Sequence, residues 1–317
     1  MSIWEEDIRE VQRAFESFRV TAKSYEESGS ERVSDYWVKV ERSEDQGGYE
    51  FIGVDGSFIV KSFTFSTLYL ARAIAIAPSI GSYRDSRSEI LETTSDDMAR
   101  QHAEAVMAYL EVKTASKALV ESVKHDREPI LLFDGSLTSL IAHRAILHRS
   151  PLHPHLVDYI ARELSLLADE SDIVFVAKRS SSSLYSGGRL PDMIFFSSMP
   201  KGFSRPKVVK ITDLFDLPEV EIENLPLTSK LKTVTLSYVR LSDGGPLLKI
   251  EVPGIRSEDE VHKIVARLSS VSPAGYPVPL LAAHNTVKLR AITLKRALSL
   301  MGIRLPSGRE ALREVLV

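Results

Sequence analysis

Hydrophobic and polar residues follow two patterns along the first ninety residues, a helical one and an extended one. Apolar residues spaced three or four positions apart over residues 3–27 predict an amphipathic helix. Residues 28–48 are polar and are expected to be loop-rich. The apolar run 49–54 predicts a buried strand, and the segment 57–77, rich in Phe, Ile, Thr and Tyr, predicts two more strands. Residues 78–89 are expected to form a connection.

The spacing becomes helical again from Asp96 to Val123, where Ser95 or Asp96 provides an N-cap. The continuous apolar run PILLF that follows predicts a central strand. Beyond it, the pattern predicts helices over roughly 138–149 and 153–168, and then a buried strand in SDIVFVAK (171–178).

The last third of the chain alternates less regularly. DMIFFSSM (192–199) predicts a strand. The segments KTVTLSYVRL and LLKIEVPG flank SDGGP, whose Asp-Gly-Gly predicts a hairpin. Ser257 and Glu260 have the spacing of a capping box. A last long helix is expected to begin near His284 and to present a basic face.

The order of these elements predicts the fold class. Three strands, a helix, a strand, a helix and another strand suit a mixed α/β sheet, and an RNase H-like core has this arrangement. We therefore expect an RNase H-like mixed sheet flanked by helices over roughly residues 49–200, with N- and C-terminal helical additions. Residues 201–317 would add strands and C-terminal helices. No repeat or long linker divides the sequence, so a single domain over residues 1–317 is expected.

Composition and charge narrow the classes of function. The 317 residues include no cysteine, which excludes disulfides and thiolate chemistry and suits a reducing cytoplasm. The N-terminus does not resemble a signal peptide, and the apolar stretch 63–77 is too short to span a membrane. The net charge is −3, but residues 285–317 hold seven basic and two acidic residues, so the basic charge is concentrated at the C-terminal end.

Two aspartates end two of the predicted buried strands. Asp55 lies in GVDGS and Asp134 lies in FDGSL. If the strands are neighbours, the two carboxylates emerge side by side and repel each other unless a cation or a shared proton neutralises them. Carboxylate oxygens suit Mg²⁺ or Mn²⁺. The alternative is that each Asp-Gly-Ser is only a turn.

A third carboxylate is expected on the helix that precedes Asp134. Glu104 and Glu111 share a helix face with small and apolar residues, and Glu111 lies near its middle. Glu111 is preferred and Glu104 remains an alternative; an exposed glutamate without a role is the other possibility. Near the C-terminus, His284 is a candidate metal ligand or general base, or a packed histidine. Tyr276, between Gly275 and Pro277, is held in a rigid turn.

Together these segments resemble the NurA nuclease family. The matching segments run in order over nearly the whole chain: GVDGS, a glutamate on the following helix, LLFDGSL, VFVAKRS, YVRL with KIEVPG, and GYPVPLLAAHN. The resemblance implies an RNase H-like fold and a manganese-dependent nuclease, with Mg²⁺ as a possible alternative metal. It also implies 5′–3′ exonuclease activity, endonuclease activity on single strands, a homodimer, and a hexameric HerA-type ATPase as partner in recombinational DNA repair.

The resemblance also assigns roles to individual residues. It implies that Asp55, Glu111, Asp134 and His284 surround the metal, with Tyr276 nearby as a further catalytic residue. Two cations about 4 Å apart would then activate a water and stabilise the leaving oxygen. Lys178 follows a strand that emerges near the same edge, so it is a candidate to hold a phosphate; the alternative is an ordinary surface lysine. The basic C-terminal helix, with Lys288 and Lys295, is expected to follow the DNA backbone.

Two other functions are compatible with parts of the pattern. An actin-like ATPase also places aspartates in turns after strands, but it needs a second three-stranded meander and a Gly-rich adenosine loop. A non-catalytic adaptor of the ATPase would keep the fold without the metal ligands. The apolar stripe at residues 3–18, beside Trp4, is expected to pack in a dimer, against the ATPase or on the protein's own core.

Overall fold

The computed structural model describes residues 33–40, 48–63, 66–92, 95–141, 154–214 and 227–300. Within these ranges, one mixed sheet runs in the order β1-β7-β9-β10-β6-β5-β2-β3-β4, and β8 also pairs with β9. The strands are β1 Trp37–Val38, β2 Tyr49–Ser62, β3 Thr67–Ala77, β4 Gly81–Leu91, β5 Glu128–Asp134, β6 Asp172–Ala177, β7 Gly202–Ser204, β8 Lys207–Lys210, β9 Thr233–Arg240 and β10 Leu247–Pro253.

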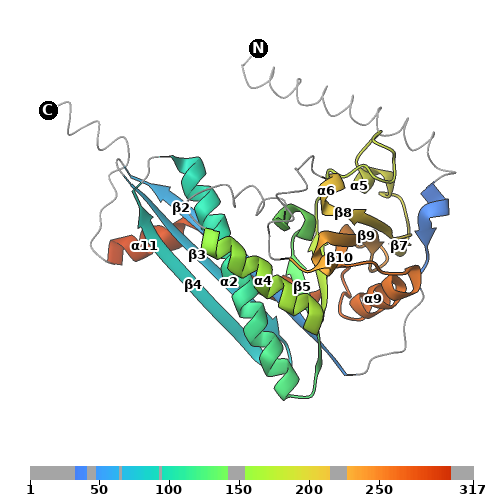
Figure 1. Ribbon diagram of the computed structural model, residues 1–317, viewed down its shortest axis with the longest axis horizontal. Coiled ribbons are helices and arrows are strands. Elements are labelled where there is room, and N and C mark those ends of the chain that lie inside the picture. Colours follow the sequence, from blue (N-terminus) through green and yellow to red (C-terminus); the bar gives the residue numbers. More distant parts are fainter. Residues whose placement is uncertain are drawn as a thin grey trace, which may run out of the picture.

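Helices cover both faces of this sheet (Figure 1). They are η1 Ser34–Tyr36, α2 Asp96–Lys124, α4 Pro154–Glu170, α5 Asp192–Phe195, α6 Ile211–Leu214, α8 Ser229–Lys232, α9 Glu258–Ser270, α10 Val278–Val287 and α11 Ala291–Leu300. In these described parts, no helix is both long and apolar enough to cross a membrane.

The first half of the sheet has the expected RNase H-like order. Strands β2, β3 and β4 form an antiparallel meander, β5 runs parallel to β2, and β6 runs parallel to β5. Strands β9 and β10 form the predicted hairpin and extend the sheet beyond β6. The predicted fold class, a mixed α/β sheet flanked by helices, is confirmed.

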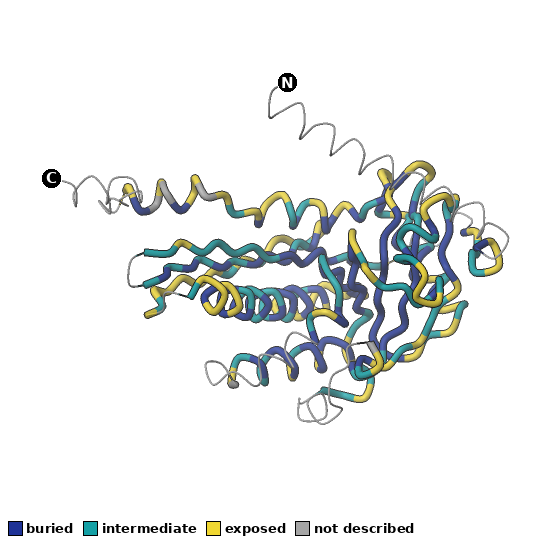
Figure 2. The backbone as a smooth tube through the Cα atoms, turned by 90° about the horizontal axis from the view of Figure 1, so that it is seen from above, coloured by how far each residue is buried: buried dark blue, intermediate teal, exposed yellow. Residues whose placement is uncertain are grey.

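Strand β2 lies between two helix layers. Its even-numbered residues Ile52 and Val54 pack against α2 in the main core cluster, while α10 packs on the opposite face. Successive side chains of a strand point to opposite faces, so Gly53 and Asp55 face α10. Figure 2 shows the buried positions concentrated between the layers. The two predicted caps are also present: Ser95 accepts a hydrogen bond from the Met98 amide at the start of α2, and Ser257 and Glu260 form the capping box of α9.

Three predicted elements differ from the structure. Strand β2 continues unbroken to Ser62, and residues 81–91 form strand β4 rather than a connection. This strand is mostly exposed and polar because it lies at the edge of the sheet, where β3 is the only described strand that pairs with it. The segment 192–199 begins with helix α5 and is not a strand, because the buried Asp192 carboxylate binds the amides of Leu184 and Tyr185 there.

The C-terminal helices also differ from the prediction. His284 does not begin a long helix but lies in the last turn of α10, and a separate helix, α11, follows at Ala291. His284 therefore does not lie at a helix N-terminus, whose partial positive charge would favour a phosphate. The carbonyl end of a helix carries partial negative charge, which favours a cation.

Candidate active site

Asp55 and Asp134 lie side by side because of the strand register. Strands β2 and β5 are parallel and pair through Val54 and Phe133, so the next residue on each strand is an aspartate. Strand β5 ends at Asp134, whereas β2 continues to Ser62 with β3 as its partner. Asp55 is 7% exposed and Asp134 is partly exposed. The pair therefore lies at the end of β5, the shorter strand, and is accessible to solvent from the Asp134 side.

His284 completes this pair from helix α10. Its Nδ1 lies 2.8 Å from Asp55 Oδ2 and 3.5 Å from Asp134 Oδ2. One ligand atom from each of the three residues lies within 4.8 Å of the others. Two carboxylates and one imidazole are donors suited to Mn²⁺. The donor set therefore fits a single divalent cation.

Burial and the neighbouring carboxylate disfavour ionisation of Asp55. Burial first, and then the nearby Asp134 carboxylate, raise the pKa of Asp55 to about 6, while the hydrogen bond with His284 opposes the shift. The Gly56 amide also donates to Asp55 Oδ1 at 2.8 Å. A divalent cation would relieve the repulsion between the carboxylates.

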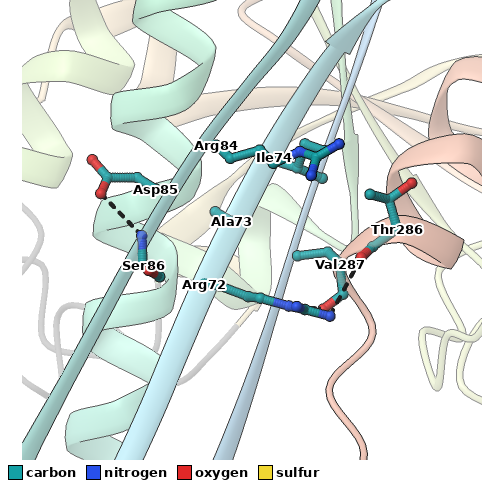
Figure 3. Close-up of a pocket in the computed structure, with 8 residues that line it drawn as sticks. All are labelled: Arg72, Ala73, Ile74, Arg84, Asp85, Ser86, Thr286 and Val287. Atoms are coloured by element: carbon teal, nitrogen blue, oxygen red, sulfur yellow. Dashed lines mark hydrogen bonds between the residues drawn. The ribbon is translucent and has the colours of Figure 1, made fainter. Parts of the chain in front are cut away.

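Arg72 contacts the C-terminal end of α10 (Figure 3), one turn beyond His284. Arg72 on β3 donates from Nε to the Val287 carbonyl at 2.5 Å and from a terminal nitrogen to the carbonyls of Thr286 and Lys288. The Leu289 amide donates to Ser57 Oγ on β2 at 3.0 Å. These contacts end α10 one turn beyond His284 and hold it against the meander.

Glu111 lies on the α2 side of strand β2, whereas the Asp55 side chain faces α10. A methyl group added at Gly56 would overlap the Glu111 carboxylate, so this carboxylate lies directly over Gly56. Glu111 is not part of the three-residue group formed by Asp55, Asp134 and His284 among the described residues. Glu104 is two helical turns, about 10 Å, nearer the start of α2. The start of α2 lies near Ser62, whose hydroxyl donates a hydrogen bond to Asp96. Glu104 is therefore farther from Asp55 than Glu111 is.

Lys178 and Tyr276 border the cluster on the Asp134 side. Lys178 Nζ donates to Asp134 Oδ2 at 2.8 Å and lies 4.5 Å from the centre of the Tyr276 ring. The Tyr276 hydroxyl is buried and makes no hydrogen bond of acceptable geometry with the described residues. Burial first, and then the carboxylates of Asp134 and Asp55, raise the Tyr276 pKa, so the phenol is held neutral.

A comparison with family models matches the NurA domain to residues 49–289. The chain belongs to the NurA family. Residues 49–289 include every candidate ligand, from Asp55 to His284.

Curated NurA relatives align over most of the chain. The DNA double-strand break repair nuclease NurA of Saccharolobus solfataricus is 24% identical over 312 residues, which cover 87% of each chain. The NurA of Sulfurisphaera tokodaii, with the same description, is 22% identical over 308 residues, covering 86% of this chain and 87% of the relative.

Solved NurA structures share the fold. The NurA nuclease from Sulfolobus solfataricus superposes with a TM-score of 0.70 at 21% identity, covering 95% of this chain and 97% of the other. A NurA bound to dAMP and manganese superposes with a TM-score of 0.64 at 13% identity, covering 98% and 100%.

The NurA-like motif KIEVPG contains two functional candidates to which the sequence analysis assigned no role. Glu251 on β10 is fully buried and accepts hydrogen bonds from Ser136 Oγ, from the Thr138 amide at 2.9 Å and from Thr138 Oγ1 at 2.8 Å. Lys249 pairs with it from the same strand. This network fixes the chain two to four residues after Asp134. The signal was available, because two charges two positions apart in an apolar strand share one face.

The two lysines expected to contact DNA lie near the end of α10 or beyond it. Lys288 is exposed directly after α10, four residues from His284. Lys295 belongs to α11, but its side chain lies outside the described residues.

Proposed function

We propose that this NurA-family protein is a metal-dependent DNA nuclease that acts in the repair of double-strand breaks in the cytoplasm. The observation that carries the proposal is the convergence of Asp55, Asp134 and His284 from two strands and a helix onto one point. The curated relatives named as DNA double-strand break repair nucleases and the solved NurA with dAMP and manganese support it.

The chain's own residues have distinct tasks in this proposal. Asp55, Asp134 and His284 would hold the cation, which when bound supplies Lewis-acid polarisation of a phosphate and lowers the pKa of a water. Lys178 Nζ donates a hydrogen bond to Asp134 and would release it to bind a phosphate oxygen of the substrate. Tyr276 supports Lys178 through its ring and keeps a neutral hydroxyl beside the carboxylates.

The finer features of the proposed activity rest on further residues. Mn²⁺ is the proposed metal, with Mg²⁺ as the alternative, because an imidazole joins two carboxylates in the donor set. We propose that Glu111, over Gly56 beside Asp55, helps to hold a second cation. Cleavage as a 5′–3′ exonuclease on single- and double-stranded DNA, and as an endonuclease on single strands, belongs to the same proposal.

We also propose that the protein forms a homodimer and works with a HerA-type hexameric ATPase. The N-terminal helix expected at residues 3–27, with its apolar stripe, lies outside the described residues. Deletion of residues 1–18 tests its role. Loss of the dimer mass in light scattering, or loss of ATPase capture, is expected, and an unchanged dimer that still binds the ATPase would leave this segment without a docking role.

The decisive test of nuclease activity compares Asp134→Asn with Asp243→Asn. Asp243 is an exposed carboxylate in the turn between β9 and β10, so its replacement changes the net charge equally. We expect Mn²⁺-dependent cleavage of an end-labelled oligonucleotide to be lost in Asp134→Asn and kept in Asp243→Asn. Equal cleavage by both variants would contradict the proposal. ATP hydrolysis by the purified wild-type protein without cleavage would favour the actin-like alternative, and the absence of both activities would favour the adaptor.

A further inference from the structure

A polar cavity opens at the end of strands β5 and β6 that carries Asp134 and Lys178, on the sheet face that bears Lys249 and Glu251. Its volume is about 800 Å³, within the range of ligand pockets. Ser136 at its wall is two residues after Asp134, and Arg179 follows Lys178 directly. Residues that closely follow Asp134 and Lys178 in the chain therefore line the cavity.

The wall of this cavity is built before any ligand binds. The serine segment 180–183 is anchored by the fully buried Asp192 carboxylate, which accepts the amides of Leu184 and Tyr185 at 2.8 Å and the Ser182 hydroxyl at 3.2 Å. The side chain of Lys249 is 8% exposed at the cavity and is oriented by Glu251. A preformed polar wall loses little entropy when it binds a ligand.

Several polar groups at this wall have no partner within the described part of the chain. The hydroxyls of Ser181 and Ser183 and the guanidinium of Arg179 make no hydrogen bond or ion pair there. Lys249 adds a second cation to the lining and Asp213 adds one anion. Hydroxyls beside Arg and Lys are the groups that usually contact phosphate oxygens of DNA.

We propose that this cavity binds the backbone phosphate of the substrate strand next to the phosphate that is cut. The inference rests on the proposed nuclease function and deepens it. Lys178 faces the cluster, whereas the adjacent Arg179 lines the cavity. A DNA strand that crosses this end of the sheet would therefore meet the two residues at two successive phosphates. Arg179 supplies the charge, and Ser181 and Ser183 supply hydroxyl donors.

The test measures single-stranded DNA binding at a series of salt concentrations in EDTA, where the strand is not cut. Removal of one phosphate contact lowers the slope of log affinity against log salt by about 0.7. We expect this decrease for Arg179→Ala and recovery of the slope for Arg179→Lys. Arg189→Ala is the matched control, because Arg189 is exposed on the same loop, makes no hydrogen bond or ion pair with described residues and does not line the cavity.

A second measurement separates this inference from the proposed function. In Mn²⁺, the ratio of kcat/KM for an oligonucleotide to that for thymidine 5′-p-nitrophenyl phosphate should fall about tenfold in Arg179→Ala and in the double variant Ser181→Ala/Ser183→Ala. An unchanged ratio and an unchanged salt slope in an active enzyme would overturn the inference. If the wild type cuts neither substrate, the proposed function itself is wrong.

Oligonucleotides with and without a 5′-phosphate identify the source of the bound phosphate. If Arg179→Ala weakens binding only of the 5′-phosphorylated strand, the cavity holds a terminal phosphate. If it weakens binding of both strands equally, the cavity holds an internal phosphodiester. Equal weakening in the Arg189→Ala control would instead show a diffuse charge effect and would overturn the assignment to this cavity.

Discussion

The backbone of Pro279 lies directly against Gly53, so that a methyl group at Gly53 would overlap the Pro279 carbonyl oxygen. This close approach brings α10 onto β2 two residues before Asp55. His284 lies one and a half turns further along the helix, which places its ring at Asp55 Oδ2. The missing side chain at Gly53 is therefore part of how the cluster is assembled.

Gly53→Ala is expected to destabilise the protein and to impair catalysis. The added methyl group meets backbone atoms, which cannot move aside without displacing α10 and His284. Overpacking of this kind costs about 1–3 kcal/mol, and a displacement of about 1 Å at a catalytic group can lower the rate about 100-fold. Thermal unfolding and Mn²⁺-dependent turnover measure the two effects.

Gly56→Ala provides the comparison for Gly53→Ala. The added methyl group there would overlap only the side chains of Met107 and Glu111, which can rotate away. We expect a smaller loss in melting temperature than for Gly53→Ala. If Gly53→Ala keeps both the melting temperature and the activity of the wild type, close packing of α10 on β2 does not position His284.

The raised pKa of Asp55 predicts how the stability of the metal-free protein depends on pH. The folded-state pKa is about 6 against 3.8 for the unfolded chain, so the folded state holds the Asp55 proton more tightly. This contribution to stability is complete below about pH 4 and is lost as the pH rises through 6, at a cost of about 2–3 kcal/mol in the free energy of unfolding.

Urea unfolding in EDTA between pH 4 and 7 tests this dependence by comparing the wild type with Asp55→Asn. The variant lacks the ionisation, so its free energy of unfolding should exceed that of the wild type increasingly towards pH 7. Mn²⁺ should restore stability at pH 7 only in the wild type. Parallel curves for the two proteins would show that Asp55 ionises in the fold as it does in the unfolded chain.

The sequence predicts strand β5 and its end at Asp134 well, because a continuous apolar run is followed there by Gly-Ser. It predicts the start of β2 but not its end, because this strand passes through Asp-Gly-Ser to Ser62. It does not predict β4, whose polar residues face solvent at the sheet edge, so no hydrophobic pattern marks it. It also predicts one long helix that begins near His284, whereas α10 spans Val278–Val287 and α11 begins at Ala291. No Gly or Pro breaks the segment 284–300, and the break is set by Arg72 and Ser57, more than 200 residues away in the chain. Such tertiary contacts leave no local signal.

His284 and Tyr276 are expected to differ in their effect on turnover. His284→Ala removes a ring that contacts both Asp55 and Asp134, so kcat should fall by about 100-fold or more, while DNA affinity changes less than about threefold. Tyr276→Phe removes a buried hydroxyl that makes no hydrogen bond with the described residues, so stability should be equal or slightly higher and kcat should fall less than about tenfold. Steady-state kinetics measure the effect of each variant on kcat, and DNA-binding measurements give its effect on affinity. If His284→Ala lowers the affinity for DNA as much as it lowers kcat, His284 acts in DNA binding.

Glu251→Gln should destabilise the segment after Asp134. The substitution keeps the shape but leaves the buried Lys249 ammonium without a counter-charge, and loss of one partner of a buried pair costs about 3–5 kcal/mol. The double variant Lys249→Met/Glu251→Gln should recover part of this stability. Denaturant unfolding measures both, and a cost below about 1 kcal/mol for Glu251→Gln would show that the network does not hold this segment.

Glu111 and Glu104 give the last prediction, because they lie at different distances from Asp55. Glu111 lies over Gly56, the residue after Asp55, whereas Glu104 is about 10 Å nearer the start of the same helix. Glu111→Gln keeps the size of the side chain and removes only the charge that would help to hold a cation. We expect a roughly 100-fold lower kcat in Mn²⁺ and a weaker response of the melting temperature to added Mn²⁺, since a cation stabilises the fold according to its affinity. Glu104→Gln, with the same change in charge on the same helix, should differ from the wild type by less than about threefold. If Glu104→Gln had the larger effect in both measurements, the third carboxylate would be Glu104.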